Sequence, residues 1–248
     1  MNPADLTNAL LYGIPLVSVF GCGYETMIST RGRHKYRNVC TDKLEKALKG
    51  ETTDRLRIAV ADSVQQLEAA WDLVKRRYVW RGYQCDQRGD GLGGQKTQSQ
   101  TTLIVNAGDA TVGTITVRVD GPRGLLAENT HPGTIDAIRN TGGKVCEITQ
   151  LAIADVGDSR TVLAKLLSIA HFVMRKVYQA TDIFIEVNPR HVDFYRRVLG
   201  FEVASGERVC ARVGAPSVLL TIALDALEDR FDAMGMGSWV RPLLEQAA

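Results

Sequence analysis

The sequence lacks the cysteine patterns of a secreted or zinc-binding protein. Its five cysteines are odd in number, lie far apart and form no Cys-x-x-Cys pair. This argues against a disulfide framework and against a zinc site. We therefore expect a cytoplasmic protein in a reducing compartment, with no bound metal.

The sequence also lacks an apolar run long enough to span a membrane. The longest candidate, residues 9–23 (ALLYGIPLVSVFGCG), is short and is interrupted by Gly13 and Pro15. The preceding MNPADLTN has none of the positive charge that a signal peptide needs. We expect no transmembrane segment, and the run either packs against the core or forms a flap over an apolar cleft, of which packing is commoner.

The chain has little excess charge and no repeats. Its 30 basic and 28 acidic side chains leave a net charge of +2, too small to indicate a nucleic-acid partner. The 248 residues are long for one domain and short for two. We expect an N-terminal extension over 1–54, which packs on the core or covers the cleft, a main domain over 55–224 and a helical tail over 225–248.

Strand-like and helix-like segments alternate along the main domain. Strands are predicted at 55–61, 101–107, 111–120, 145–154, 182–188, 208–214 and 217–224. Helices are predicted at 62–83 and 158–179, with a short one after Pro189, a hairpin turn at Gly108-Asp109 and a polar, Gly-rich loop over 86–100. This order predicts an α/β (α+β) fold with a mixed, mostly antiparallel sheet and helices on both faces. A cleft is expected where neighbouring parallel strands separate at their carboxyl ends.

Two stretches carry a resemblance to a known family. Residues 188–201 read N-P-x-H-x-x-F-Y-x-x-x-L-G-F, a pattern that resembles the GNAT acyltransferase superfamily, in which two parallel strands splay apart. CEITQLAI, DSRTVLAKLLSIA and IEVNPRHVDFYRRVLGFE are most similar to the long-chain N-acyl amino acid synthases, relatives of the acyl-homoserine-lactone autoinducer synthases. The resemblance covers roughly residues 55–224. It implies transfer of a fatty acyl chain from acyl carrier protein to the α-amine of an amino acid. It also implies no tightly bound cofactor, since the donor's acyl group is carried on the phosphopantetheine of the carrier protein.

The sequence departs from these relatives at three places. ADVGDSRTVL lacks the Q/R-x-x-G-x-G/A motif with which acetyl-CoA enzymes cradle a pyrophosphate, which favours a carrier-protein thioester over CoA. Gln150 replaces an arginine of the autoinducer synthases and weakens that alternative. Tyr195 lies five residues before Gly200, where the superfamily's tyrosine lies four residues before the glycine. A catalytically silent domain that binds a fatty acyl ligand is the remaining alternative.

Glu147 and Tyr195 are the candidates for catalysis. Strand alternation predicts that Glu147, Thr149 and Leu151 share one face, where partial desolvation would raise the pKa of Glu147 and suit it to accept a proton from the amine. The resembling families also have a glutamate here, although a strand-end glutamate paired with an arginine is the alternative. By the resemblance, Tyr195 protonates the departing thiolate; otherwise its ring is simply buried.

The candidates for substrate binding surround these two residues. Backbone N–H groups near Ala152, Ile153 and Ala154 are expected to stabilise the developing oxyanion. Thr149 adds a hydroxyl or fills the sheet. Further candidates are Leu151, Arg160, Asn188 and His191. Arg160 would bind the pantetheine phosphate or remain solvated, and His191 would otherwise cap the turn after Pro189.

Basic residues form the candidate docking surface for acyl carrier protein. The candidates are Lys75, Arg76, Arg77, Arg81, Arg196 and Arg197. Acyl carrier proteins present an acidic helix, so a basic patch would steer docking, although charge runs are also common on solvated faces. Three aromatic residues lie among the arginines, namely Tyr78, Trp80 and Tyr83. They would line the acyl cleft or stack on a nucleic acid, and the modest net charge disfavours the latter.

Overall fold

The computed structural model describes residues 56–83, 100–157 and 159–234. The predicted extension over 1–54, residues 86–99 of the Gly-rich loop and residues 235–248 of the tail lie outside the described residues. Within the described part, no helix combines the length and the hydrophobicity needed to cross a bilayer.

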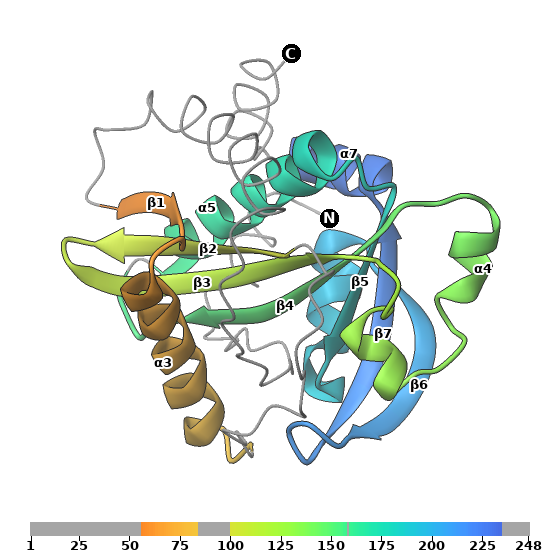
Figure 1. The fold of residues 1–248 in the computed structure, drawn as a ribbon, viewed down its shortest axis with the longest axis horizontal. Coiled ribbons are helices and arrows are strands. Elements are labelled where there is room, and N and C mark those ends of the chain that lie inside the picture. The colour runs from red at the N-terminus through yellow and green to blue at the C-terminus, as the bar shows by residue number, and fades with distance from the viewer. Residues whose placement is uncertain (1–55, 84–99, 158, 235–248) are drawn as a thin grey trace.

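A seven-stranded sheet in the order β1-β2-β3-β4-β5-β7-β6 forms the centre of the protein (Figure 1). The strands are β1 (Leu56–Val60), β2 (Gln100–Ala107), β3 (Ala110–Val119), β4 (Val145–Ile153), β5 (Asp182–Val187), β6 (Glu202–Cys210) and β7 (Ala215–Ala223). β4 and β5 are parallel, and the other neighbouring pairs are antiparallel. The predicted mixed, mostly antiparallel sheet is confirmed.

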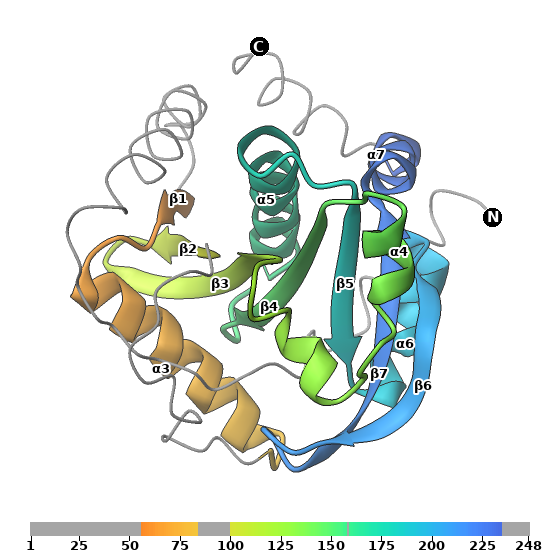
Figure 2. The ribbon, with the colours of Figure 1, turned by 45° about the vertical axis from the view of Figure 1, so that its right-hand side comes forward.

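Helices cover both faces of the sheet, as predicted. α3 (Val64–Trp80) packs on one face, and α5 (Ser159–Phe172) and α7 (Leu224–Ala233) lie on the other (Figure 2). α3 begins where predicted, because the Ser63 hydroxyl accepts the N–H of Gln66 at 3.2 Å and the Gln66 side chain accepts the N–H of Ser63 at 3.2 Å. The main core fills the space between the sheet and α5, and a smaller cluster lies under α3.

Short helical segments connect the remaining strands. Between β3 and β4 the chain forms η1 (Leu126–Asn129) and α4 (Asp136–Asn140). A π-helical turn, η2 (Val173–Val177), ends α5. After β5 come η3 (Pro189–His191), α6 (Val192–Phe194) and a second π-helical turn, η4 (Tyr195–Leu199), which ends at Gly200 with a φ of 82°.

β4 and β5 run together for only part of their length. Their pairing extends from Val145 opposite Asp182 to Ile148 opposite Ile185. Beyond these rows both strands continue without pairing to each other, β4 to Ile153 and β5 to Val187. The expected parting of two parallel strands is confirmed.

A bulge in β4 lies just beyond the last paired row. Gln150 has a φ of 53°, and the register between β4 and β3 shifts at this point. The bulge also reverses the alternation of side chains, so Leu151 joins Ile148 in the core under α5 while Ala152 joins the cluster under α3. The prediction that Leu151 shares a face with Glu147 and Thr149 is therefore wrong, because one extra residue separates them.

The edge strand β6 is longer than predicted. It begins at Glu202, whereas the sequence pattern placed a strand over 208–214. Most of β6 is exposed, so its residues lack the apolar alternation that marks a half-buried strand. The predicted hairpin at Gly108-Asp109 is confirmed, with a φ of 60° at Gly108.

Close packing of α5 on β3 at Gly113 yields a stability prediction. A Cβ atom at Gly113 would lie 2.4 Å from Cγ1 of Val162 and 3.1 Å from Cδ1 of Leu166. Overpacking of this kind costs about 1–3 kcal/mol, so Gly113→Ala should lower the free energy of unfolding by that amount in denaturant titrations. Gly206→Ala is the matched control, since a Cβ there meets nothing within 4 Å, and it should change stability by less than about 0.5 kcal/mol. Equal stability of the two variants would contradict the packing argument.

Candidate functional site

Glu147 lies on β4 in the paired part of the strand and is fully buried. Its Oε2 accepts the backbone N–H of Leu126 at 2.8 Å, and its Oε1 accepts that of Ala127 at 3.0 Å. Both donors belong to η1, so this short connection between β3 and β4 fixes the carboxyl group. Two arginines, Arg212 and Arg118, also act on this carboxyl group through their charges, so the alternative of a glutamate paired with an arginine stays open.

The surroundings of Glu147 give it an unusual pKa. Burial raises the pKa to about 7 from an ordinary value of 4.5, and the charges of Arg212 and Arg118 oppose the rise. The carboxyl group is therefore divided between its ionised and protonated forms near neutral pH. A general base works best when its pKa lies close to the working pH.

A second buried carboxylate, Glu186 on β5, lies on the same face of the sheet. Its Oε2 accepts Nη2 of Arg212 at 2.5 Å, and its Oε1 accepts the hydroxyl of Ser217 at 2.6 Å. Nε2 of His131 lies 3.8 Å from Oε1, and its Nδ1 lies 3.0 Å from the hydroxyl of Ser205. Burial lowers the pKa of His131, so the ring is neutral at pH 7.

The sequence analysis missed this cluster, although part of it left a signal. Arg118 and Glu186 are charged residues inside otherwise apolar strands, which is the pattern that singled out Glu147. His131 and Arg212 lie in connections between elements, where charged residues are common. No feature of the sequence distinguishes those two.

Backbone N–H groups of β4 face the space that the parting of the strands opens. The N–H of Ala154 donates to the carbonyl of Val112 on the β3 side at 2.8 Å, so this group is unavailable to an oxyanion. Because successive N–H groups along a strand point in opposite directions, those of Leu151 and Ile153 point away from β3, towards the unpaired side. Of the region predicted around 152–154, Ile153 therefore has the suitable orientation, together with Leu151.

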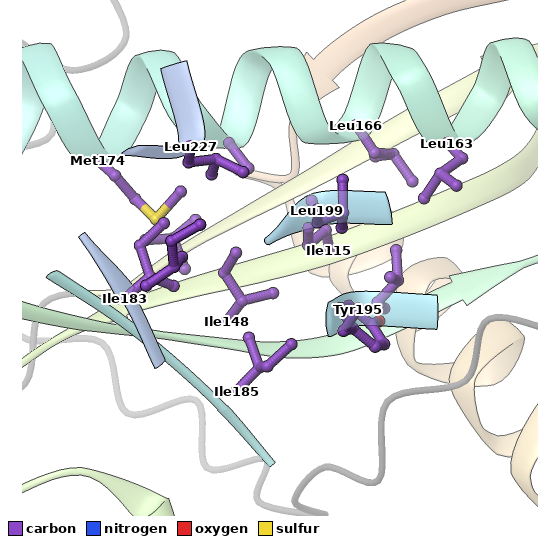
Figure 3. Packing of buried hydrophobic residues seen from close by; sticks show 14 of the residues in the cluster. Ile115, Ile148, Leu163, Leu166, Met174, Ile183, Ile185, Tyr195, Leu199 and Leu227 are labelled. Carbon is purple, nitrogen blue, oxygen red and sulfur yellow. The ribbon is translucent and has the colours of Figure 1, made fainter. Parts of the chain in front are cut away.

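Tyr195 lies on the opposite face of the sheet from Glu147. Its side chain is buried between Phe194 and Phe201, with ring centroids 5.4 and 5.7 Å away. It also lines a small apolar cavity of about 20 Å³ beside the parted strands, together with Ile148 and Ile185 (Figure 3). Burial raises the pKa of Tyr195, so its hydroxyl keeps its proton at neutral pH.

The π-helical turn η4 accounts for the unusual spacing of Tyr195. The N–H of Gly200 donates to the carbonyl of Tyr195, five residues earlier, where an α-helical bond would span four. A π-helical turn accommodates one extra residue. Tyr195 therefore reaches the parted strands even though it lies one residue further from the glycine than the superfamily pattern has it.

Asn188 and His191 both follow β5. The side chain of Asn188 caps η3 by accepting the N–H of Arg190 at 3.3 Å, and it donates to the carbonyl of Pro216 at 3.2 Å. The expectation that His191 caps this turn is therefore wrong. His191 is buried, and burial together with the charges of Arg190 and Arg81 lowers its pKa to about 4.

Arginines and aromatic residues gather where the end of α3 meets η3. The guanidinium groups of Arg77 and Arg81 lie 4.9 and 4.2 Å from the ring centroid of Trp80, and that of Arg190 lies 5.5 Å from Tyr83. None of these three arginines has a carboxylate within 4 Å among the described residues. The described residues thus bring three arginines without a carboxylate partner among them to the end of β5, and Arg190 is a member that the sequence analysis missed.

The other basic candidates lie elsewhere. Arg76 is exposed on α3 and Lys75 pairs with Asp72 at 3.8 Å. Arg196 and Arg197 are exposed on η4, on the other face of the sheet from α3. The predicted docking residues therefore do not form one patch. Arg160 is exposed in the first turn of α5.

A polar hollow of about 420 Å³ lies next to η1. Arg139 lines it and is held by Asp120 at 2.6 Å, Glu128 at 2.5 Å and Asp136 at 2.8 Å. All three nitrogens of this guanidinium group are bound by carboxylates. Arg139 therefore has a structural role beside η1, the segment that holds Glu147.

Comparisons with known proteins agree with this geometry. Residues 69–223 match the family described as N-acyl amino acid synthase FeeM. The solved structure of FeeM, an N-acyl amino acid synthase from uncultured soil microbes, is similar with a TM-score of 0.64 and 24% identity, over 72% of this chain and 96% of that one. Escherichia coli ElaA (TM-score 0.46, 14% identity, 67% and 97% covered) and the acyl-homoserine-lactone synthase LasI (0.46, 13%, 71% and 93%) are more distant. A search of curated proteins finds no match.

The family match spans more than half of the chain, and the fold agrees with it. The protein therefore belongs to the FeeM family of N-acyl amino acid synthases and is an N-acyltransferase of the GNAT fold.

Proposed function

We propose that the protein transfers a long-chain fatty acyl group from acyl carrier protein to the α-amine of an amino acid by direct aminolysis of a thioester. The observation that carries this proposal is Glu147, a fully buried carboxyl group with a pKa raised to about 7 beside two parallel strands that part. Family membership supports the class of product.

In the proposed reaction the amine nitrogen forms a bond to the thioester carbonyl carbon, and the carbon–sulfur bond breaks. Glu147 accepts the proton that the amine loses. The N–H groups of Leu151 and Ile153 stabilise the negative charge that develops on the carbonyl oxygen. The departing phosphopantetheine thiolate takes a proton from the hydroxyl of Tyr195, which regains one from solvent.

The sheet separates the two substrates in this arrangement. Glu147 lies on the α3 face and Tyr195 on the α5 face, and the parted strands connect the faces. The amino acid therefore approaches from the α3 face, while the apolar cavity beside Tyr195 marks where the acyl chain begins. An acyl chain would have to widen this cavity, because its present volume of about 20 Å³ is roughly that of one water molecule.

Two features support a carrier protein as the donor. The connection from β4 to α5 lacks the glycine pattern that cradles a pyrophosphate, so a donor without pyrophosphate suits it. The arginines where α3 meets η3 have no carboxylate partner among the described residues, and they would attract an acidic helix.

Replacement of the proposed base tests the function directly. Glu147→Gln keeps the shape of the side chain but cannot accept the proton, so kcat should fall by about 10²–10⁴-fold. The measurement is mass spectrometry of lipid extracts from cells that express either protein. N-acyl amino acids should accumulate with the unaltered chain and be lost with the variant. Glu202→Gln, at an exposed carboxylate on β6, is the matched control and should retain product. New acyl lactones, or no new lipid from the unaltered chain, would overturn the proposal.

The raised pKa of Glu147 predicts a pH dependence of stability. The folded protein holds this proton more tightly than the unfolded chain, so the contribution of Glu147 is favourable below its ordinary value of 4.5 and is lost as pH rises through about 7. The free energy of unfolding of the unaltered protein, minus that of Glu147→Gln, should therefore be smaller at pH 8 than at pH 5. Denaturant titrations at the two pH values measure this difference. A difference that is independent of pH would show that Glu147 ionises near its ordinary value.

Charge reversal distinguishes the arginines where α3 meets η3 from those on η4. Arg190→Glu, at the exposed member of the first group, should raise KM for acyl carrier protein by about tenfold and make it less sensitive to salt, because charged residues at the rim of an interface steer association. Arg196→Glu, at an exposed arginine on the opposite face, should leave KM within about twofold. The reverse result would place the carrier protein on the η4 side.

A further inference from the structure

Arg212 is a largely buried arginine, and only one of its three guanidinium nitrogens donates a hydrogen bond to an oxygen or nitrogen of the described residues. It lies in the turn between β6 and β7, and its side chain points inwards with 9% of its surface exposed. Nη2 binds Glu186 at 2.5 Å. Nε and Nη1 are also buried, and no oxygen or nitrogen of the described residues accepts a hydrogen bond from either. The remaining neighbour is the sulfur of Cys210, which is a weak acceptor.

Unpaired donors of this kind are costly to bury. Each unsatisfied buried donor costs about 1–3 kcal/mol, and more when it carries charge. The carboxylate of Glu186 cannot serve the remaining nitrogens fully, because its other oxygen accepts the hydroxyl of Ser217. A ligand with acceptor oxygens would satisfy the donors that the described residues leave open.

Arg139 shows the contrast within the same protein. Its Nε, Nη1 and Nη2 atoms all donate to carboxylates, at distances from 2.5 to 2.8 Å. That guanidinium group is fully used in holding α4 to the neighbouring loops. Arg212 is more deeply buried than Arg139 and has fewer partners.

The charges around Arg212 match those of a free amino acid. The groups around Arg212 are Arg118 on β3, Glu147 on β4, Glu186 on β5, the thiol of Cys210 at the end of β6 and the neutral His131. Glu147 pairs with Phe184, and Glu186 lies two residues further along β5 on the same face, so the guanidinium group that Glu186 holds lies near Glu147. The charge of Arg212 accordingly opposes the rise in the pKa of Glu147. A zwitterion could therefore place its ammonium group at Glu147 and its carboxylate at Arg212.

We infer that Arg212 binds the α-carboxylate of the amino acid acceptor through the nitrogens that Glu186 leaves unpaired. This inference rests on the proposed function and deepens it. Arg212 fixes one end of the acceptor so that the amine lies at Glu147. It also selects α-amino acids over amines that lack a carboxylate. Glu186 is a positioning residue, since it acts by holding Arg212.

The test compares an acceptor with its carboxamide. The probe is the L-amino acid, from a panel of the twenty, that the purified full chain acylates fastest with acyl carrier protein as donor, together with the amide of the same amino acid. The unaltered protein should favour the acid over the amide by about 30- to 100-fold in kcat/KM, because the amide leaves the buried guanidinium group without an anion. Arg212→Gln should raise KM for the acid by a similar factor and leave KM for the amide within about threefold.

Two further variants separate binding from folding. Arg208→Gln removes an exposed arginine of the neighbouring strand and should retain the preference for the acid. Arg212→Gln leaves Glu186 buried without its arginine, so Arg212→Gln/Glu186→Gln removes both charges and should show the same loss of preference in a folded protein. Thermal unfolding with and without the acid provides a readout that does not need turnover, since the acid should raise Tm of the unaltered protein but not of either Arg212 variant.

The outcomes separate the two proposals. If the unaltered chain forms N-acyl product but accepts acid and amide equally, or if Arg212→Gln weakens both equally, the inference about Arg212 is overturned while the proposed function stands. If no N-acyl product forms from any acceptor, the proposed function fails. In that case, if no amino acid of the panel raises the Tm of the unaltered protein, the inference about Arg212 is overturned as well.

Discussion

The parting of β4 from β5 is the constraint on which the rest of the site depends. Parallel strands that stay paired along their length satisfy one another's backbone groups and leave no room between them. Here pairing ends at Ile148 and Ile185, and the bulge at Gln150 turns the following residues of β4. Backbone donors, an apolar cavity and a buried carboxyl group thus come to lie around one opening. If the strands stayed paired, no substrate could reach any of the three.

The two faces of the sheet have different chemical characters near this opening. On the α5 face the neighbours of Tyr195 are aliphatic and aromatic, and the one electrostatic effect on its pKa is desolvation. On the α3 face two carboxylates and two arginines are buried together with a neutral histidine. A carboxyl group whose pKa is raised to about 7, that of Glu147, and a phenol that stays protonated, that of Tyr195, are therefore kept apart by the thickness of one sheet. In the proposed reaction this division lets one side accept a proton while the other donates one.

Much of the fold could be predicted from the sequence, because its elements depend on local patterns. The capping pair of Ser63 and Gln66, the turn at Gly108-Asp109 and the end of the helix at Gly200 each leave a short signal of known physical origin. β6 was placed too late because an exposed edge strand has no apolar periodicity. The face of Leu151 was wrong because a glutamine gives no sign that it will adopt a positive φ, which costs strain and is held by the surrounding sheet.

The site was predicted only in part, for a related reason. Glu147 stood out as a charge within an apolar strand, and its burial and raised pKa follow from that position. His131 and Arg212 come from connections whose paths depend on long-range packing, so their convergence on Glu186 of β5 left no trace in local sequence. The contact of Arg190 with Tyr83 likewise joins residues far apart in the chain.

The wide turn at η4 bears on how distant relatives should be compared. A π-helical turn takes up one extra residue, and the helix can continue in its original direction beyond it. The residues before and after the turn can then keep the positions they have in a relative without the insertion. The number of residues between a tyrosine and a later glycine is then a poor guide to whether the phenol keeps its place. For chains of this kind, comparison of backbone geometry will identify equivalent residues that a fixed count along the alignment would discard.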